Sequence, residues 1–193
     1  HKTLTGPRAA VILTTDPELS KRIDKAVFPG EQGGPHTQVF AALATNFKIA
    51  ATPEFKVYQQ QILNNTQAII KQLQSRGIKV AYQGSNSHML LVDCKCIKGE
   101  DGTTLSGDMA ARILDNAGIV LNRNTIPGDK SALRASGIRM GTSCITQIGL
   151  KEEESAQVAD IIADLLLAIH PYSMPGAKGL LQRAKIDFDV FES

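Results

Sequence analysis

Lys2 is the first residue whose type and surroundings could support chemistry. It lies between His1 and the turn-forming segment 6–8, which is followed by the apolar run 9–13. A lysine amine is nucleophilic only when it is neutral, and burial or a nearby cation favours the neutral form. Held at the end of a sheet, such an amine could form a Schiff base with a carbonyl compound. The alternative is an exposed charge, which is the more common state of an unassigned lysine.

Two other segments could bind anions. Gly33 and Gly34 precede a predicted helix, and paired glycines there let backbone N–H groups approach an anion closely. Arg139 lies in a short apolar stretch between glycines, and its planar guanidinium could bind a carboxylate with two hydrogen bonds. The alternatives are a plain turn for the glycines and a structural ion pair or an exposed strand charge for Arg139. The polar stretch 122–127 could equally satisfy only local backbone groups.

Composition excludes several classes of function. The chain has 193 residues, of which 42% are hydrophobic and 21% charged, so it can bury a core. Its net charge of +2, without a basic block, does not indicate a nucleic-acid partner. No signal peptide is visible, and no apolar run approaches the roughly 18 residues of a membrane span. We therefore expect neither a nucleic acid nor a membrane as partner.

Cysteine and histidine positions indicate neither disulfides nor a metal site. The three cysteines cannot all pair within one chain, and their spacing with the histidines does not match a metal-ligand pattern: Cys94, Cys96, Cys144, His36, His88 and His170. This usage is typical of a reducing compartment. We expect no metal and a cytoplasmic location.

The hydrophobic pattern predicts an α/β protein in which strands and helices alternate. Predicted strands cover 9–13, 79–83, 89–94, 119–121 and 137–141. Predicted helices begin at Pro17 and Pro53, the second ending at Gly77, and otherwise cover 36–51, 106–117, 155–169 and 177–185. Residues 28–35 interrupt regular structure. A long helix from residue 53 could connect two bodies, so we place a domain boundary between residues 52 and 53.

Taken together, these segments resemble the serine hydroxymethyltransferase family, pyridoxal-phosphate enzymes of the aspartate-aminotransferase fold (fold type I). The resemblance lies in five blocks that occur in the order and spacing of the family. The blocks are His1-Lys2-Thr3-Leu4 with Gly6-Pro7-Arg8, Val27-Phe28-Pro29-Gly30 with Gln32-Gly33-Gly34-Pro35, Phe55-Lys56 with Tyr58-Gln59-Gln60-Gln61, Asn122 with Asn124 and Pro127, and Ser136-Gly137-Ile138-Arg139 with Gly141-Thr142.

The resemblance implies a division of the fold and a missing part. Residues 1–52 would form the end of the large cofactor-binding domain, and residues 53–193 the small C-terminal α/β domain. The family has a long segment before its lysine, which supplies most of the phosphate site and the groups around the cofactor ring. We therefore expect an N-terminal half of the same enzyme as a partner, in the same or a separate chain.

The resemblance also implies roles for residues at the cofactor. Lys2 matches the lysine that carries pyridoxal 5'-phosphate and is the expected catalytic residue. His1 matches the residue beside it in the cofactor pocket, and Arg8 a nearby supporting arginine. Gly33 and Gly34 match a loop whose backbone contacts the cofactor phosphate across a dimer interface.

Three further residues match substrate-binding positions of the family. Arg139 matches the arginine that binds the amino-acid carboxylate. Asn124 and Phe28 match positions that seat the folate, with Phe28 supplied by the neighbouring subunit. The implied reaction, part of one-carbon metabolism, interconverts serine plus tetrahydrofolate with glycine plus methylenetetrahydrofolate in a homodimer or tetramer.

Departures from the family pattern leave two alternatives open. Ala9-Ala10 replaces a glycine pair, Ser131-Ala132-Leu133 replaces a folate-contact stretch, and Gln147 stands where the family has an arginine. These changes would suit a relative that acts on another β-hydroxy amino acid with little folate dependence. The missing half would suit a non-catalytic fragment.

Overall fold

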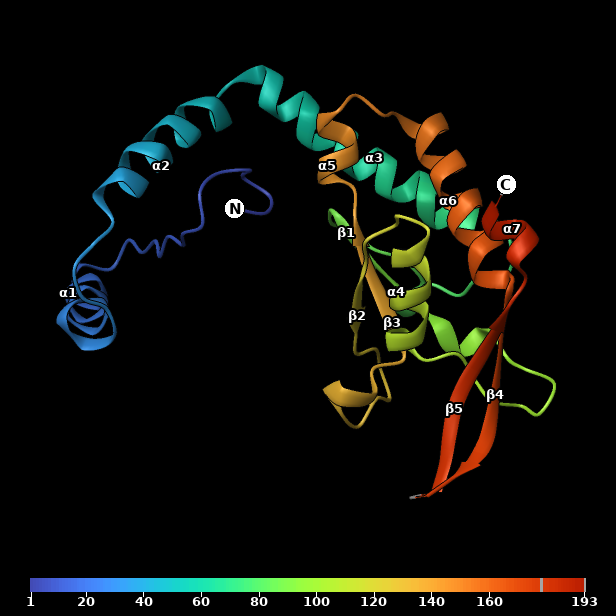
Figure 1. Cartoon of the computed structure of the whole chain (residues 1–193). Helices are drawn as coiled ribbons and strands as arrows, with labels where there is room; N and C mark the ends of the chain where they lie inside the picture. The colour runs from blue at the N-terminus through green and yellow to red at the C-terminus, as the bar shows by residue number, and fades with distance from the viewer. Residues whose placement is uncertain (178, 193) are drawn as a thin grey trace. The chain divides into compact units, whose positions relative to one another are not determined.

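A computed structural model describes residues 1–177 and 179–192, and the chain divides into two compact units, His1–Val57 and Tyr58–Ser193 (Figure 1). Strands and helices both occur, which confirms the predicted α/β class. The proposed boundary at residues 52/53 concerns the domains of a larger protein, and it stays a prediction.

The first unit consists of an extended segment and helices. α1 (Pro17–Lys25) begins at Asp16, whose carboxylate accepts hydrogen bonds from the N–H groups of Glu18 and Leu19. A kinked segment, Ala26–Glu31, leads to α2 (Thr37–Ala50). Both predicted helices are confirmed.

The strand predicted at 9–13 is wrong. These residues are exposed, and they form no ladder with another strand in the part of the chain that the structure describes. An apolar run becomes a strand only where a neighbour accepts its backbone hydrogen bonds. The first unit contains no such neighbour among its described residues.

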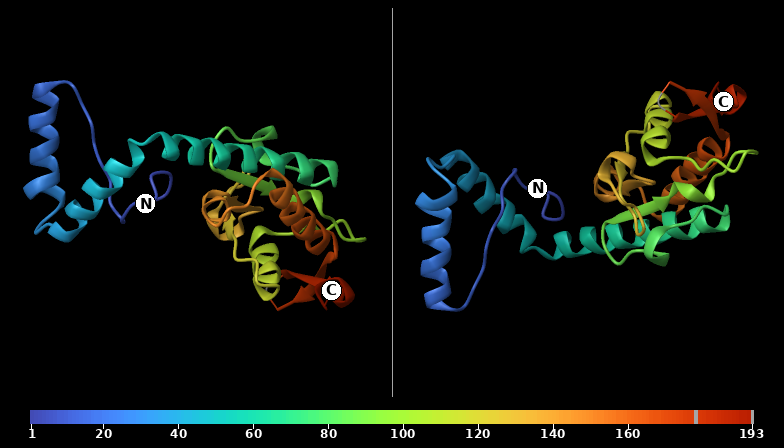
Figure 2. Two further views of the ribbon diagram at one scale, coloured as in Figure 1. Left: turned by 90° about the horizontal axis from the view of Figure 1, so that it is seen from above. Right: turned by 90° about the horizontal axis from the view of Figure 1, so that it is seen from below.

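α3 (Pro53–Ser75) begins as its sequence predicts. The Thr52 hydroxyl accepts a hydrogen bond from the Phe55 N–H at 3.3 Å, and Gly77, with φ of 77°, follows the last turn. Its buried apolar side chains recur at helical spacing: Ile62, Ile69, Ile70 and Leu73. In the second unit α3 runs along the sheet (Figure 2).

The three-stranded sheet has the order β1-β3-β2, with β1 (Met89–Asp93), β2 (Asn122–Asn124) and β3 (Gly137–Gly141) all antiparallel to their neighbours. The predicted strands 89–94 and 137–141 are confirmed. The strand predicted at 79–83 is wrong. Only Val80 forms a β-bridge, to Val92, and a 3-10 turn, Ala81–Gln83, follows directly. The strand predicted at 119–121 begins instead at Asn122.

The second unit also contains the helices α4 (Gly107–Asn116), α5 (Ser143–Gln147) and α6 (Glu152–Leu167). Ser106 caps α4 through a hydrogen bond from the Met109 N–H, and Gly118 at φ of 81° follows it, as predicted. The helix predicted over 155–169 is confirmed, and it begins earlier, at Glu152.

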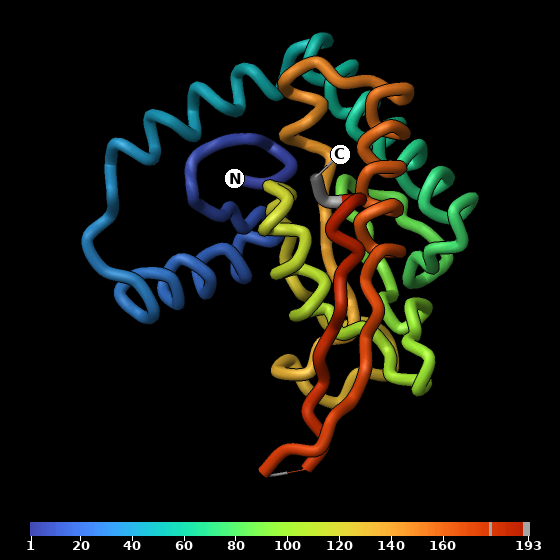
Figure 3. Tube along the Cα trace, turned by 45° about the vertical axis from the view of Figure 1, so that its right-hand side comes forward, coloured from blue at the N-terminus to red at the C-terminus, as the bar shows by residue number. Residues whose placement is uncertain are grey.

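The C-terminal region differs from its prediction. Instead of a helix over 177–185, of which Lys178 lies outside the described residues, an antiparallel hairpin pairs β4 (Ile169–Gly176) with β5 (Gly179–Ile186) (Figure 3). A short helix, α7 (Phe188–Glu192), follows. Pairing with β4 satisfies the backbone of β5, and this overrides the helix propensity of its Leu, Gln, Arg, Ala and Lys residues.

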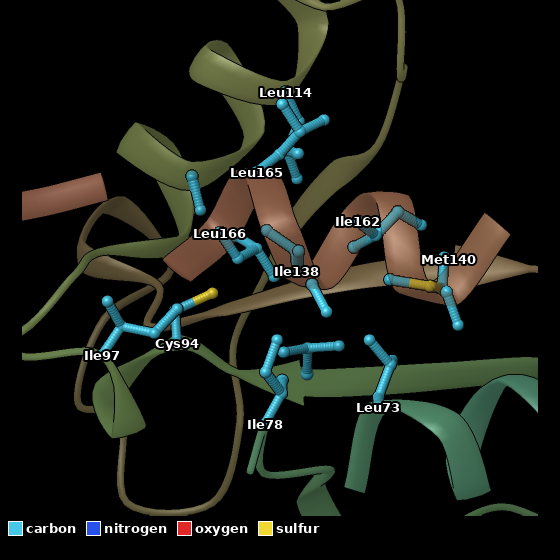
Figure 4. Packing of buried hydrophobic residues seen from close by; sticks show 14 of the residues in the cluster. Leu73, Ile78, Cys94, Ile97, Leu114, Ile138, Met140, Ile162, Leu165 and Leu166 are labelled. Atoms are coloured by element: carbon cyan, nitrogen blue, oxygen red, sulfur yellow. The ribbon is translucent and has the colours of Figure 1, made fainter. Parts of the chain in front are cut away.

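One hydrophobic core holds the second unit together. Figure 4 shows Ile138 and Met140 of β3 in the same cluster as Leu73 of α3 and Ile162 and Leu166 of α6. Within the described ranges 1–177 and 179–192, no helix combines the length and apolarity needed to cross a membrane. The core covers one face of the sheet, so a binding site can form only on the opposite face.

Candidate functional site

Lys2 lies in a turn at the start of the first unit. Its carbonyl accepts a hydrogen bond from the Thr5 N–H at 3.2 Å, and its side chain is exposed, as are those of His1 and Arg8. Gly6 anchors this segment on α2, because a Cβ at Gly6 would lie 2.6 Å from Nδ2 of Asn46. Lys2 thus lies four residues before the close contact of Gly6 with Asn46, and its amine is accessible to solvent.

Gly33 and Gly34 are exposed, and a Cβ at either position would meet no atom within 4 Å. Neither has a positive φ. Packing and backbone conformation within the described chain therefore do not require glycine at these positions. Their open backbone can be approached closely by an external group. Phe28, also in this unit, is 61% exposed.

Arg139 and Asn124 lie on the face of the sheet opposite the core. Arg139 pairs with Leu91 on one side and Asn122 on the other, while its neighbours Ile138 and Met140 are buried. Asn124 follows Asn122 by two residues, so it shares the face of Arg139. The register therefore brings together the two predicted substrate residues of the second unit.

Both side chains line one open pocket of ≈ 270 Å³. Arg139 is half-buried, and no carboxylate forms an ion pair with it among residues 1–177 and 179–192. Asn124 donates a hydrogen bond from Nδ2 to the Thr125 carbonyl at 2.8 Å. A half-buried guanidinium without a counter-charge is suited to bind an anionic ligand.

Of the other residues that line this pocket, three have polar side chains and were not predicted as site residues: Tyr82, Ser85 and Ser87. Tyr82 is 74% exposed and adopts φ of 56°, which is uncommon for a bulky residue. The hydroxyl of Ser85 accepts a hydrogen bond from the Ser87 N–H at 3.1 Å, which shapes the turn. The only signal in the sequence was the Gly84-Ser85 turn before β1, which does not identify a site.

Asp129 was also missed. It lies in the loop between β2 and β3, and its carboxylate accepts hydrogen bonds from the N–H groups of Ile126 and Ser136 and from the Ser136 hydroxyl. Burial acts to raise the pKa of this carboxyl, but these hydrogen bonds and the charge of Lys95 outweigh burial and hold the pKa below its usual value. Asp129 is therefore a charged acceptor that joins both ends of the loop.

A larger cavity of ≈ 820 Å³ lies between α4, the 3-10 turn Ala132–Arg134 and the hairpin. Its lining includes three arginines, Arg112, Arg134 and Arg183. None of the predicted site residues lines it.

The cysteines are free thiols. Cys94 is fully buried, and burial raises the pKa of its thiol, so it behaves as a core residue. In the described part of the chain, no group of three or more His, Cys, Asp or Glu side chains is placed to hold a metal ion.

Comparison with known proteins assigns a family to this arrangement. The sequence model described as "Serine hydroxymethyltransferase" matches residues 1–162. A serine hydroxymethyltransferase of Cyanothece sp. is 46% identical over 168 residues, which are 86% of this chain and 38% of that protein.

Two further relatives carry the same name. The protein of Crocosphaera subtropica is 46% identical over 192 residues, or 99% of this chain and 43% of the relative. That of Rickettsia canadensis is 47% identical over 167 residues, or 86% and 38%. The chain thus spans well under half the length of these curated relatives, and it belongs to the serine hydroxymethyltransferase family.

Proposed function

We propose that this chain is the C-terminal part of a pyridoxal-phosphate-dependent serine hydroxymethyltransferase, which transfers a one-carbon unit between serine and tetrahydrofolate. Its family supports this assignment, as do relatives of which it covers 38–43%. The observation that carries the proposal is the half-buried Arg139, without a carboxylate partner in the described chain and beside Asn124 in one pocket. No feature of residues 1–177 and 179–192 favours another β-hydroxy amino acid.

Arg139 binds the carboxylate of serine or glycine in this proposal. Two parallel N–H···O bonds from a planar guanidinium fix both the position and the rotation of a carboxylate. Orientation of the substrate lowers the barrier because the bond to be broken at Cα is held in place before reaction. Asn124, on the same face, offers an amide to the folate.

The residues of the first unit would hold the cofactor. Pyridoxal phosphate, when bound, supplies an aldehyde that reacts with amines and a ring that accepts electrons from Cα. The exposed Lys2 amine is accessible to such an aldehyde, with His1 and Arg8 near it in sequence. The open backbone at Gly33 and Gly34 leaves room for a phosphate, so the residues present fit the cofactor.

Exposed apolar side chains of the first unit support the proposal that it binds a partner. It exposes several large apolar side chains: Leu4, Val11, Ile12, Leu13, Phe28, Phe40 and Phe47. Apolar surface on this scale is typical of an interface. We assign it to the N-terminal half of the enzyme and to a second subunit of a homodimer or tetramer, which would receive Phe28, Gly33 and Gly34.

The domain assignment and location belong to the same proposal. Residues 1–52 would close the large domain of a fold type I enzyme, and residues 53–193 would form its small domain. The three free thiols agree with a reducing, cytoplasmic setting.

Kinetics of the complete enzyme that carries this chain test the role of Arg139. Arg139→Lys keeps the charge but loses the fork, so the KM for serine should rise by about tenfold or more, the equivalent of one charged hydrogen bond. Arg123→Lys is the matched control, because Arg123 lies on the neighbouring strand and pairs with Asp108 outside the pocket. Equal KM values in the two variants would contradict the proposal.

A second measurement tests Lys2. The complete enzyme should show an absorbance band of lysine-bound cofactor near the visible edge, and Lys2→Ala should lack it. If the unmodified enzyme binds no pyridoxal phosphate, the chain is instead a non-catalytic module. Serine cleavage that is independent of tetrahydrofolate would point to the other amino-acid substrates.

A further inference from the structure

The loop 125–136 connects the two predicted substrate residues of the second unit. It leaves β2 directly after Asn124 and enters β3 shortly before Arg139. Its base is closed by the pairing of Asn124 with Gly137. The path of this loop therefore affects both side chains of the pocket.

Asp129 holds the two ends of the loop together. One carboxylate oxygen, Oδ2, accepts the Ile126 N–H at 3.0 Å and the Ser136 N–H at 2.9 Å, and the other accepts the Ser136 hydroxyl. The side chain is only 5% exposed, and Nζ of Lys95 lies 3.9 Å from Oδ1. The N–H groups of Ile126 and Ser136 lie in the loop and outside its strands. The Asp129 carboxylate therefore supplies the acceptor that a neighbouring strand would otherwise provide.

The base of the loop is also tightly packed. A Cβ on Gly137 would overlap Cγ2 of Ile126 and lie 3.0 Å from the carbonyl oxygen of Asn124. Ile126 is buried, and its N–H is one of the groups that Asp129 holds. Ile126 and the carbonyl of Asn124 therefore both pack against Gly137 at the base of the loop.

Asn124 is oriented by the same stem. Its Nδ2 donates to the carbonyl of Thr125, the first residue of the loop, so the position of that carbonyl determines where the amide oxygen of Asn124 points. The strand pairing fixes only its backbone.

We propose that Asp129 is a positioning residue, whose carboxylate fixes the loop 125–136 so that Asn124 is oriented toward the same pocket as Arg139. This inference rests on the proposed function, because it assumes that the pocket binds the substrates. Asp129 does not itself line the pocket, and it acts through Ile126 and Ser136.

A matched control is available in the same unit. Asp101 also accepts two backbone N–H groups, of Thr103 at 2.9 Å and Ser173 at 2.8 Å, and the Thr103 hydroxyl at 2.9 Å. It is absent from the lining of the pocket. Replacement of either aspartate by alanine thus removes the same set of acceptor contacts from different loops.

The test uses the complete enzyme. Asp129→Ala should raise the KM for tetrahydrofolate by about tenfold, and should speed amide hydrogen exchange within residues 125–136. Asp101→Ala should leave this KM unchanged and speed exchange only around residues 101–103 and 173. Asp129→Asn keeps one oxygen for the two backbone N–H groups, so its KM for tetrahydrofolate should stay close to the wild-type value. This variant also tests the inference if Asp129→Ala does not fold.

Two outcomes would overturn the inference. One is an Asp129→Ala enzyme with wild-type KM, and the other is an equal rise of KM in Asp101→Ala. A wild-type enzyme that does not turn over serine would instead contradict the proposed function. In that case the rates of amide hydrogen exchange still test the inference. If residues 125–136 exchange as fast in the wild-type protein as in Asp129→Ala, the Asp129 carboxylate does not hold the loop in place.

Discussion

Arg139 and its neighbours on β3 occupy opposite environments. Ile138 and Met140 are buried in the core, whereas Arg139 faces the pocket. A shift of the β-pairing by one residue would turn Arg139 into the core, where an unpaired charge is costly. The apolar pattern of the strand therefore also determines the direction of its one charged side chain.

Gly137 gives a prediction at the scale of one residue. Gly137→Ala should lower the free energy of unfolding by about 1–3 kcal/mol, because a buried Cβ there has no space beside Ile126 and Asn124. Urea unfolding of the chain without cofactor measures the change. Gly33→Ala, where a Cβ meets no atom, should change stability by less than about 0.5 kcal/mol. Equal losses in both variants would contradict the claim that close packing around Gly137 excludes a Cβ.

Sequence reasoning could identify Arg139 but not Asp129. Arg139 lies in a short alternating stretch, and the period of two residues in a strand already separates its side chain from Ile138. The acceptors and donors around Asp129 come together only when β2 and β3 pair. Its surroundings in the sequence, Pro127-Gly128-Asp129, are typical of any turn.

Among the elements, α3 and α5 are joined by buried hydrogen bonds rather than by apolar contacts alone. Asn65 of α3 donates to the Thr146 hydroxyl and the Leu150 carbonyl, both at 2.8 Å, and it accepts from Gln61. Thr66 and Thr142, both fully buried, are hydrogen-bonded to each other at 2.8 Å. Because α5 directly follows β3, this contact also fixes the end of the strand that carries Arg139.

The corresponding prediction is made for Asn65→Ala. The substitution removes the donor to the buried Thr146 hydroxyl and to the half-buried Leu150 carbonyl, and the loss of such hydrogen bonds costs about 1–3 kcal/mol of stability. Gln60→Ala is the control on the same helix, because Gln60 is exposed and bonds only to Asn64 in the described chain, and about 0.5 kcal/mol or less is expected. Chemical denaturation of the two variants provides the measurement. A smaller loss for Asn65→Ala than for Gln60→Ala would mean that the buried network does not join the helices.

The elements that sequence reasoning got wrong are those whose state depends on a partner. Helices with a cap and an apolar stripe, such as α3 and α6, were predicted well because both signals are local. The residues of β5 have helix-forming side chains, but β4 pairs with them along their whole length. Residues 9–13 have strand-forming side chains but form no ladder within the described chain.

Across the whole molecule, the hydrophobic core is confined to one unit. All buried apolar side chains among the described residues lie between Ile62 and Pro171, and Asn46 is the one buried residue among those described in the first unit. The second unit thus has the core of an independent body. The predicted long helix is confirmed as α3, which begins in the first unit and ends in the second, whereas the domain boundary at residues 52/53 stays a prediction.

Carboxyl groups of the second unit make its stability depend on pH. Five have pKa values below their usual range: Asp101, Asp129, Glu152, Glu154 and Asp160. The pKa of Asp160 is lowered by hydrogen bonds from Gln72 and then from Arg76. A carboxyl whose pKa is lower in the folded state binds protons more tightly when unfolded, so its stabilisation is present above the unfolded pKa and is lost as pH falls through the folded value.

We therefore expect the thermal midpoint of the second unit to be constant near neutral pH and to fall once the pH drops below about 4, the usual range of these carboxyls. Asp160→Asn should lower the midpoint at neutral pH and reduce its slope in acid, because one of the linked protons is removed. Circular dichroism melts across this pH range measure both effects. A variant that keeps the full acid slope would exclude Asp160 from the linkage. High salt should weaken the contribution of the half-exposed Asp160–Arg76 pair more than that of Asp129, whose carboxylate is bound by backbone N–H groups away from solvent.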